Sequence, residues 1–305
     1  MNRPAATPRR FDSLSDLHRA LGLPKPLHPL ISLVDNRTNQ VAHQLLATPF
    51  SLNFYKIAYK PRLQGKFRYG QHFYDFDEGG LIFVAPNQVS AGAVPNGDHS
   101  GYTLLVHPDF LLTYPLAKRI AQYGFFSYSA NEALHLSETE KTTILAIFTL
   151  IGDELSSRID ACSQDVLISQ LELLLNYANR FYQRQFITRK ALSHDLLQQV
   201  EEVLTTYLTN ENLSHRSLPT VQYLASCVHF SPNYLSDMLR TLTGQNAQQY
   251  IHQKLIEKAK EKLATTSLTV SEVAYELGFE HSQSFSKLFK LKTTLSPLEF
   301  RRSFK

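Results

Sequence analysis

The feature that most restricts the fold of this chain is an internal repeat near its C-terminal end. The segment TVQYLASCVHF, from Thr220 to Phe230, matches TVSEVAYELGF, from Thr269 to Phe279, at an offset of 49 residues. In both copies the apolar residues recur at i, i+3, i+4 and i+7, which is the spacing of one helix stripe. The two stripes are Val221, Leu224, Ala225 and Val228, and then Val270, Val273, Ala274 and Leu277.

Each stripe is followed by a break and a second helix. His229 and Gly278 occupy the breaks, where a positive φ is expected, and both residue types tolerate it better than most. The second helices are predicted at about 231–241, with Ser231 as N-cap, and at about 281–291. Their predicted buried faces are Leu235, Met238 and Leu239, and Phe285, Leu288 and Phe289.

The opposite faces of these two second helices are polar. They carry Asn233, Asp237 and Arg240 in the first copy, and Gln283, Lys287 and Lys290 in the second. A helix, a tight turn and a helix with a polar outer face are typical of a helix-turn-helix unit, whose second helix enters the major groove of DNA. Asn and Gln side chains can read adenine, while Lys can reach guanine or a phosphate.

A further helix, predicted over 246–264, connects the two units. About 20 residues at 1.5 Å each give a length of ~30 Å. Successive major-groove segments on one side of DNA lie ~34 Å apart. We therefore expect one copy of the chain to read two adjacent groove segments.

The run KAKEKLATTSLTVSEVAYELGFEHSQSFSKLFKLKTTLSPLEFR (258–301) and the segment SPNYLSDMLRTLTG (231–244) resemble the AraC/XylS family of transcription regulators. The resemblance covers about 194–305 and implies a seven-helix domain whose third and sixth helices read DNA. The sequence departs from the family pattern at Thr294, where glycine is usual, at Lys287, where arginine is usual, and at the acidic Asp237. The predicted DNA-binding residues are Asn233, Ser236, Asp237, Arg240, His281, Ser282, Gln283, Lys287 and Lys290.

The N-terminal half is predicted to be a β region followed by a helix pair. Short runs rich in β-branched and aromatic residues lie between about 30 and 110, and two amphipathic helices lie between 137 and 184. This order is similar to the cupin-like barrel and dimerising helices of the family. The predicted fold is α+β with two domains, a sensor and dimerisation domain at 1–190 and a DNA-binding domain at 191–305. The polar stretch 183–193 is the expected linker, and packing of the helix pair in the core is the alternative to dimerisation.

Composition excludes several classes of protein. The two cysteines, Cys162 and Cys227, are too few for a disulfide framework or a zinc site. No apolar run approaches the ~20 residues that span a bilayer, and no secretory signal is evident. The formal charge of +4 is a weak indicator, but basic residues gather between His281 and Lys305. We expect a cytoplasmic protein that does not contact the membrane.

The sequence gives weaker indications of catalysis, metal binding or ligand binding than of DNA binding. His72, His99 and His107 form no spacing typical of a metal site, and no nucleophile motif is present, so no catalytic residue, metal or cofactor is predicted. The expected partners are double-stranded DNA, a small-molecule effector, a second copy of the chain and RNA polymerase. A constitutive regulator and a metal-dependent cupin enzyme remain alternative hypotheses. Aromatic residues that line either a pocket or the core are Phe54, Tyr55, Tyr59, Phe67, Tyr69, Phe73, Tyr74 and Phe76.

Overall fold

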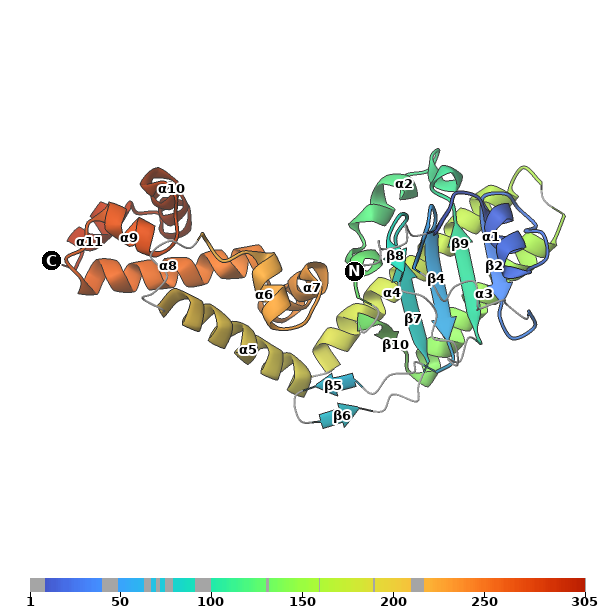
Figure 1. Cartoon of the computed structure of the whole chain (residues 1–305), viewed down its shortest axis with the longest axis horizontal. Helices are drawn as coiled ribbons and strands as arrows, with labels where there is room; N and C mark the ends of the chain where they lie inside the picture. Colours follow the sequence, from blue (N-terminus) through green and yellow to red (C-terminus); the bar gives the residue numbers. More distant parts are fainter. Residues whose placement is uncertain are drawn as a thin grey trace, which may run out of the picture. The chain divides into compact units, whose positions relative to one another are not determined.

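The chain forms two compact units, Met1–Gln185 and Phe186–Lys305 (Figure 1). Helices predominate, and the strands lie in the N-terminal unit. The computed structural model describes residues 9–39, 49–62, 67–69, 72–74, 79–90, 100–129, 132–158, 160–188, 190–209 and 217–304.

The N-terminal unit begins with a small sheet and a capped helix. Strands β1 (Arg9–Phe11), β3 (Phe50–Leu52) and β8 (Val89–Ser90) pair in the order β1-β3-β8. Helix α1 (Leu14–Leu21) starts where Ser13 accepts a hydrogen bond from the Asp16 amide and ends at Gly22 in the left-handed conformation. These elements share one apolar cluster, which includes Phe11, Leu14, Leu17, Phe54 and Leu105.

A five-stranded antiparallel sheet forms the body of this unit. Its order is β10-β7-β4-β9-β2. The strands are β2 (Ile31–Asp35), β4 (Tyr55–Lys60), β7 (Gly80–Val84), β9 (Tyr102–Val106) and β10 (Leu134–His135). Within the described residues no pairing joins the end strands β10 and β2, so the sheet is open there and the expected closed barrel is not seen. A separate hairpin pairs β5 (Phe67–Tyr69) with β6 (His72–Tyr74).

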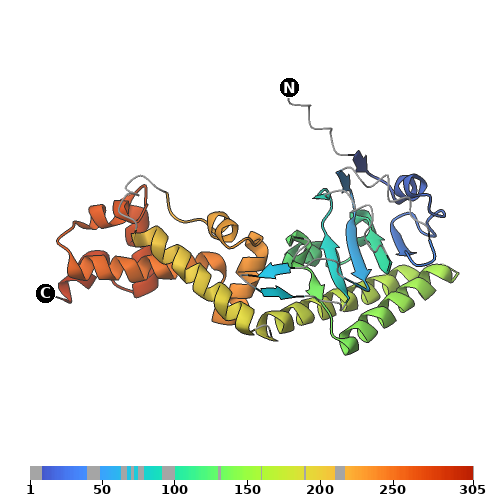
Figure 2. The same cartoon turned by 60° about the horizontal axis from the view of Figure 1, so that its bottom comes forward.

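Helices cover one face of the five-stranded sheet (Figure 2). Tyr102 stacks on Phe148 at 5.7 Å between ring centroids, and Phe83 contacts Phe125 at 4.4 Å. Helix α3 (Glu138–Ser156) begins at a capping box formed by Ser137 and Glu140. The segment before it contains η2 (Pro108–Leu111), α2 (Leu116–Arg119), η3 (Ile120–Gln122) and η4 (Gly124–Ser127).

The apolar faces of the two helices predicted between 137 and 184 are packed in the core of the N-terminal unit. Helix α4 (Ser163–Thr188) runs antiparallel to α3, because Arg184 near its end donates to Glu140 at the start of α3 at 2.6 Å. Leu171 is 0% exposed, so the face expected to dimerise is instead packed inside the unit. The exposed large apolar residues described on the pair are Leu150, Val166, Leu173 and Ile187.

The stretch predicted as a linker, 183–193, is helical on both sides of residue 189. It contains no glycine or proline to end a helix, so α4 continues to Thr188 and α5 (Lys190–Thr209) follows. The C-terminal unit continues with α6 (Val221–Cys227), α7 (Pro232–Thr243), α8 (Ala247–Thr265), α9 (Val270–Glu276), α10 (Ser282–Thr293) and α11 (Pro297–Arg302). Across the described residues, no helix is long and apolar enough to cross a membrane.

Candidate nucleic-acid interface

The first helix-turn-helix unit consists of α6 and α7. Thr220 caps α6 by accepting from the Tyr223 amide at 3.1 Å. His229 adopts a φ of 60° in the turn, as predicted. Ser231 then caps α7 by accepting from the Tyr234 amide at 3.3 Å, with Pro232 as the first helical residue. These local signals fix where both helices begin.

The second unit repeats this construction in α9 and α10. Thr269 and Glu272 form a capping box at the start of α9, and Gly278 adopts a φ of 87° in the turn. Helix α10 differs from α7 at both ends. Its N-cap, His281, makes no side-chain cap hydrogen bond, and its C-cap, Thr294, has a φ of 67°. The corresponding C-cap of α7 is Gly244, with a φ of 76°.

Apolar packing fixes which faces of α7 and α10 stay outside. In the first unit, the buried residues of α7 include Leu235, Met238 and Leu239. In the second unit, Phe285 and Phe289 of α10 are buried, with 5.7 Å between their ring centroids. Leu288, which the pattern predicts as buried, is only half-buried. The polar stripes are therefore left on the opposite faces.

The outer face of α7 carries a paired charge. Asn233 and Arg240 are exposed, and the Arg240 guanidinium lies 2.7 Å from Asp237, whose side chain is half-buried. Opposite charges three residues apart on a helix can pair, so the spacing of Asp237 and Arg240 could have indicated this ion pair from the sequence. Ser236 is placed differently, because its hydroxyl accepts from the Ala247 amide at 3.3 Å and braces the start of α8.

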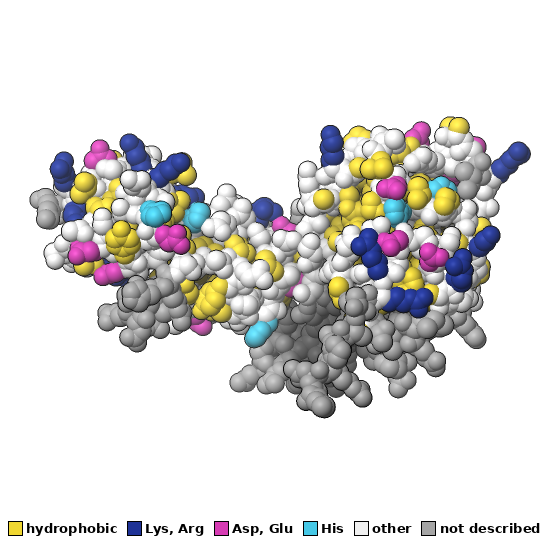
Figure 3. All heavy atoms as spheres, turned by 45° about the horizontal axis from the view of Figure 1, so that its top comes forward, with side chains coloured by type: hydrophobic (Ala, Val, Ile, Leu, Met, Phe, Trp, Pro, Cys, Tyr) yellow, Lys and Arg dark blue, Asp and Glu magenta, His cyan; other side chains and the backbone are white. Residues whose placement is uncertain are grey.

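The outer face of α10 carries uncompensated charge. His281, Gln283, Lys287 and Lys290 are exposed, and Ser282 is half-buried. No carboxylate of the described residues lies within ion-pair distance of Lys287 or Lys290. Figure 3 shows several Lys and Arg side chains gathered on the visible face of the C-terminal unit. Most predicted DNA-binding residues thus lie on the outer faces of α7 and α10, while His281 and Ser282 lie at the start of α10 and Ser236 braces α8.

Helix α8 holds the two units together. It starts at a capping box formed by Asn246 and Gln249, and its 19 residues correspond to a length of ~28 Å. Lys262 on α8 forms an ion pair with Glu276 of α9 at 2.6 Å, and Arg301 of α11 donates to the Leu263 carbonyl at 3.2 Å. The apolar side of α8 is buried along its whole length, at Tyr250, Ile251, Leu255, Ile256, Ala259 and Leu263.

Two titratable groups near α10 have shifted pKa values. Burial, followed by the nearby charge of Lys292, lowers the pKa of His252 below its ordinary value. Hydrogen bonds from Ser296 at the cap of α11 lower the pKa of Glu299. At pH 7 the histidine is therefore neutral and the carboxylate ionised, so the lysines of α10 dominate the local potential.

The predictions of chemistry in the N-terminal unit have mixed outcomes. His107 accepts from the Asp109 amide at 3.2 Å and caps η2, which is a structural role. The side chains of His72 and His99 lie outside the described residues. Among the described residues no group of three His, Cys, Asp or Glu is placed to hold a metal ion.

The aromatic residues that the structure describes act as core. Phe54 is 0% exposed, and Tyr59 is 7% exposed. Tyr55 packs edge-to-face on Phe126 at 4.9 Å. The side chains of Phe67, Tyr69, Phe73, Tyr74 and Phe76 lie outside the described residues.

Comparisons with known proteins concern mainly the C-terminal unit. A family model described as a helix-turn-helix domain matches residues 224–303. The regulatory protein SoxS of Salmonella typhimurium is 33% identical over 72 residues, which cover 24% of this chain and 67% of SoxS. The HTH-type transcriptional regulator YijO of Escherichia coli, described as uncharacterized, is 34% identical over 90 residues. That match covers 30% of this chain and only 32% of the length of YijO.

Among solved structures, the C-terminal domain of the response regulator yesN from Fusobacterium nucleatum is 33% identical to this chain. The match covers 33% of this chain and 96% of that domain, with a TM-score of 0.29.

Proposed function

Because this chain belongs to the AraC/XylS family of DNA-binding transcription regulators, we propose that α7 and α10 enter two successive major-groove segments on one face of a duplex. The observation that carries this proposal is the pair of helix-turn-helix units packed on one helix, α8, whose apolar side is buried. The ~28 Å length of α8 is close to the ~34 Å repeat of the major groove. One copy of the chain then covers two turns of DNA.

The two recognition helices contribute unequally to binding. Lys287 and Lys290 have no acidic partner among the described residues, so they release counterions when they approach phosphates. Arg240 is already paired with Asp237, and an aspartate that faces the groove is favourable mainly where it accepts from a cytosine amine. The unit of α10 therefore supplies more of the affinity, and the unit of α7 more of the discrimination between sequences.

The N-terminal residues, 1–190, supply the response to a small effector and the contact with a second copy, while 191–305 bind DNA. The contact with a second copy uses the outer faces of α3 and α4, where Leu150, Val166 and Leu173 are exposed. A contact with RNA polymerase completes the proposal by analogy with the family.

Binding-site selection with the purified full chain tests this proposal. We expect a motif of two blocks about 10–10.5 base pairs apart, one for each recognition helix. A motif with a single block would contradict the insertion of both helices.

Two variants then distinguish the contributions of α7 and α10 to DNA binding. Their affinities are measured on selected and random duplexes at several salt concentrations. Lys287→Ala should weaken binding by ~1–3 kcal/mol if it contacts a base, and flatten the salt dependence by about one unit if it contacts phosphate. Asp237→Ala should free Arg240, leave affinity for random DNA equal or tighter, and relax the preference at one position. Lys118→Ala, which removes an exposed charge of the N-terminal unit, is the control. Equal loss of affinity on both duplexes for Asp237→Ala would make Asp237 a structural residue.

A further inference from the structure

The outer edge of strand β2 has hydrogen-bonding groups that find no partner among the described residues. β2 is the last strand of its sheet and pairs only with β9 in the described part of the chain. Two further main-chain hydrogen bonds lie at the two ends of the β2–β9 pairing. The His107 amide donates to the Leu30 carbonyl at 2.7 Å, and the Asn36 amide donates to the Gly101 carbonyl at 2.8 Å. Bonded and non-bonded residues alternate in an antiparallel pair. Ile31 and Leu33 therefore direct their N–H and C=O groups away from β9.

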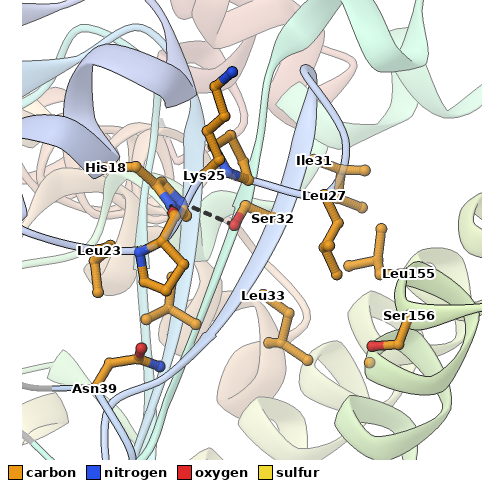
Figure 4. Close-up of a pocket in the computed structure, with 14 residues that line it drawn as sticks. His18, Leu23, Lys25, Leu27, Ile31, Ser32, Leu33, Asn39, Leu155 and Ser156 are labelled. Carbon is orange, nitrogen blue, oxygen red and sulfur yellow. Dashed lines mark hydrogen bonds between the residues drawn. The ribbon is translucent and has the colours of Figure 1, made fainter.

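A cavity of about 260 Å³ lies at this edge (Figure 4). One wall is the connector between α1 and β2, including Leu23 and Leu27, and the other is the end of α3, including Leu155 and Ser156. Ile31 and Leu33 both line the cavity. No main-chain hydrogen bond of the described residues reaches their outward groups. A buried amide or carbonyl without a partner is unfavourable, so the edge is suited to a ligand that supplies one.

Among the described residues that line the cavity, Lys25 is the charged one. His18 and Ser32 satisfy each other, with 3.0 Å between Nε2 and the hydroxyl, and His18 Nδ1 lies 2.6 Å from the Pro24 carbonyl. Lys25 directs its amino group away from the other labelled side chains in Figure 4. There is no Asp or Glu among the lining residues that the structure describes. The free groups are therefore those of the strand edge, set between apolar walls.

We propose that this cavity binds a short, uncharged, apolar peptide, which adds to the free edge of β2 as an extra strand. Main-chain hydrogen bonds to a sheet edge are the general means by which an extended peptide is held. Since Ile31 and Leu33 are two residues apart, three ligand residues suffice to reach both. Binding of the peptide does not depend on the proposed DNA contacts. Its role as an effector of the regulator rests on the proposed function.

The experiment measures binding of capped tripeptides of Ala, Val and Leu, such as acetyl-Val-Ala-Val-N-methylamide, to the full chain by calorimetry and saturation-transfer NMR. We expect saturable binding. N-methylation of the amide that pairs with the strand should weaken binding about tenfold, equivalent to ~1.4 kcal/mol. Tripeptides that bind equally well with and without these N-methyl groups would overturn strand addition.

Two variants locate the site. Ser156→Trp fills the cavity from an exposed position at the end of α3 and should abolish binding, with folding checked by circular dichroism. Thr149→Trp, at an exposed α3 position outside the cavity, should bind as the parent chain does. Unchanged binding by Ser156→Trp, or no saturable binding of any peptide by the parent chain, would overturn the proposal. DNA binding measured on the same samples shows separately whether the proposed function fails.

Discussion

Single residues decide how each recognition helix ends. Gly244 and Thr294 occupy equivalent C-cap positions, and both adopt the left-handed conformation. This conformation is freely accessible to glycine but unfavourable for a β-branched residue. At this cap position the second unit therefore carries backbone strain that the first lacks.

Exchanging the two cap residues should have opposite effects on stability. Thr294→Gly should raise the free energy of unfolding by about 0.5–1 kcal/mol, because relief of ~1–2 kcal/mol of strain exceeds the greater entropy of glycine in the unfolded chain. Gly244→Thr should lower it by about 1–2 kcal/mol, since open space around the position leaves strain as the main effect. Urea unfolding of both variants measures this. A loss of stability in Thr294→Gly would mean that its hydroxyl bond to the Thr293 carbonyl outweighs the strain.

Lys56, on the central strand β4, is the second residue with a measurable consequence. It is half-buried and has no ion-pair partner among the described residues. Burial, and then the charge of Lys60, lower its pKa from 10.5 to about 8. The folded chain thus holds this proton less tightly than the unfolded chain does.

Lys56→Met should stabilise the protein at pH 7 by about 1–2 kcal/mol, a value discounted for the partial exposure of the lysine. Between pH 8 and 10.5 the unfolded parent chain binds more protons at this site than the folded chain does. The free energy of unfolding of the parent chain therefore increases as the pH rises through this range. The advantage of Lys56→Met over the parent should therefore shrink across that window. Thermal unfolding from pH 7 to 10 measures this, with Lys118→Met as control. A constant advantage would rule out a titrating Lys56.

At the scale of elements, helix α4 has two faces with separate roles. Its inner face is core, whereas its outer face presents Val166 and Leu173. Polar contacts tie α4 to the segment before α3, including Tyr114 with Asp165 at 2.5 Å and Tyr123 with Asn176 at 3.0 Å. Its orientation in the unit is therefore fixed from two sides.

A charge introduced on each face of α4 should distinguish packing from association. Leu171→Glu buries a carboxylate at a fully enclosed position and should unfold the N-terminal unit, at a cost of more than ~3 kcal/mol. Leu173→Glu, at a position 43% exposed, should leave the fold intact and weaken the dimer. Sedimentation and circular dichroism on both variants measure this. A Leu173→Glu variant that dimerises as the parent chain does would exclude this face.

At the scale of the whole molecule, the contacts divide the chain at Gln185 and Phe186. Phe186 is 4% exposed and packs on Tyr234 of α7 at 5.1 Å. The C-terminal unit therefore includes the last residues of α4, slightly before the boundary at 190 that composition indicates.

We predict that the fragment 186–305 folds and binds DNA alone, more weakly than the full chain. The fragment 191–305 lacks Phe186 and should be less stable by roughly 3 kcal/mol, the usual cost of losing a buried aromatic side chain. Thermal unfolding and titration with DNA compare the two fragments. Equal stabilities would place the boundary at 190, and an unfolded 186–305 would show that this unit does not fold independently.

The sequence predicts best what is decided locally. The cap at Ser231 and the positive φ of His229 are confirmed because each depends on residues within one turn. The bracing role of Ser236 was missed because its partner, the Ala247 amide, is placed by the following helix. The order of the sheet and the cavity at β2 depend on pairings across the unit, which strand propensity does not specify.

The position of β2 also has a consequence for synthesis of the chain. Its only described partner, β9, begins 67 residues after β2 ends, at Tyr102 against Asp35. At ~5–20 residues per second, the ribosome takes about 3–13 s to deliver that partner. For those seconds the nascent strand has both edges open to other chains. Prolines at positions 24, 26 and 29 lie directly before it, and such residues hinder pairing between nascent chains.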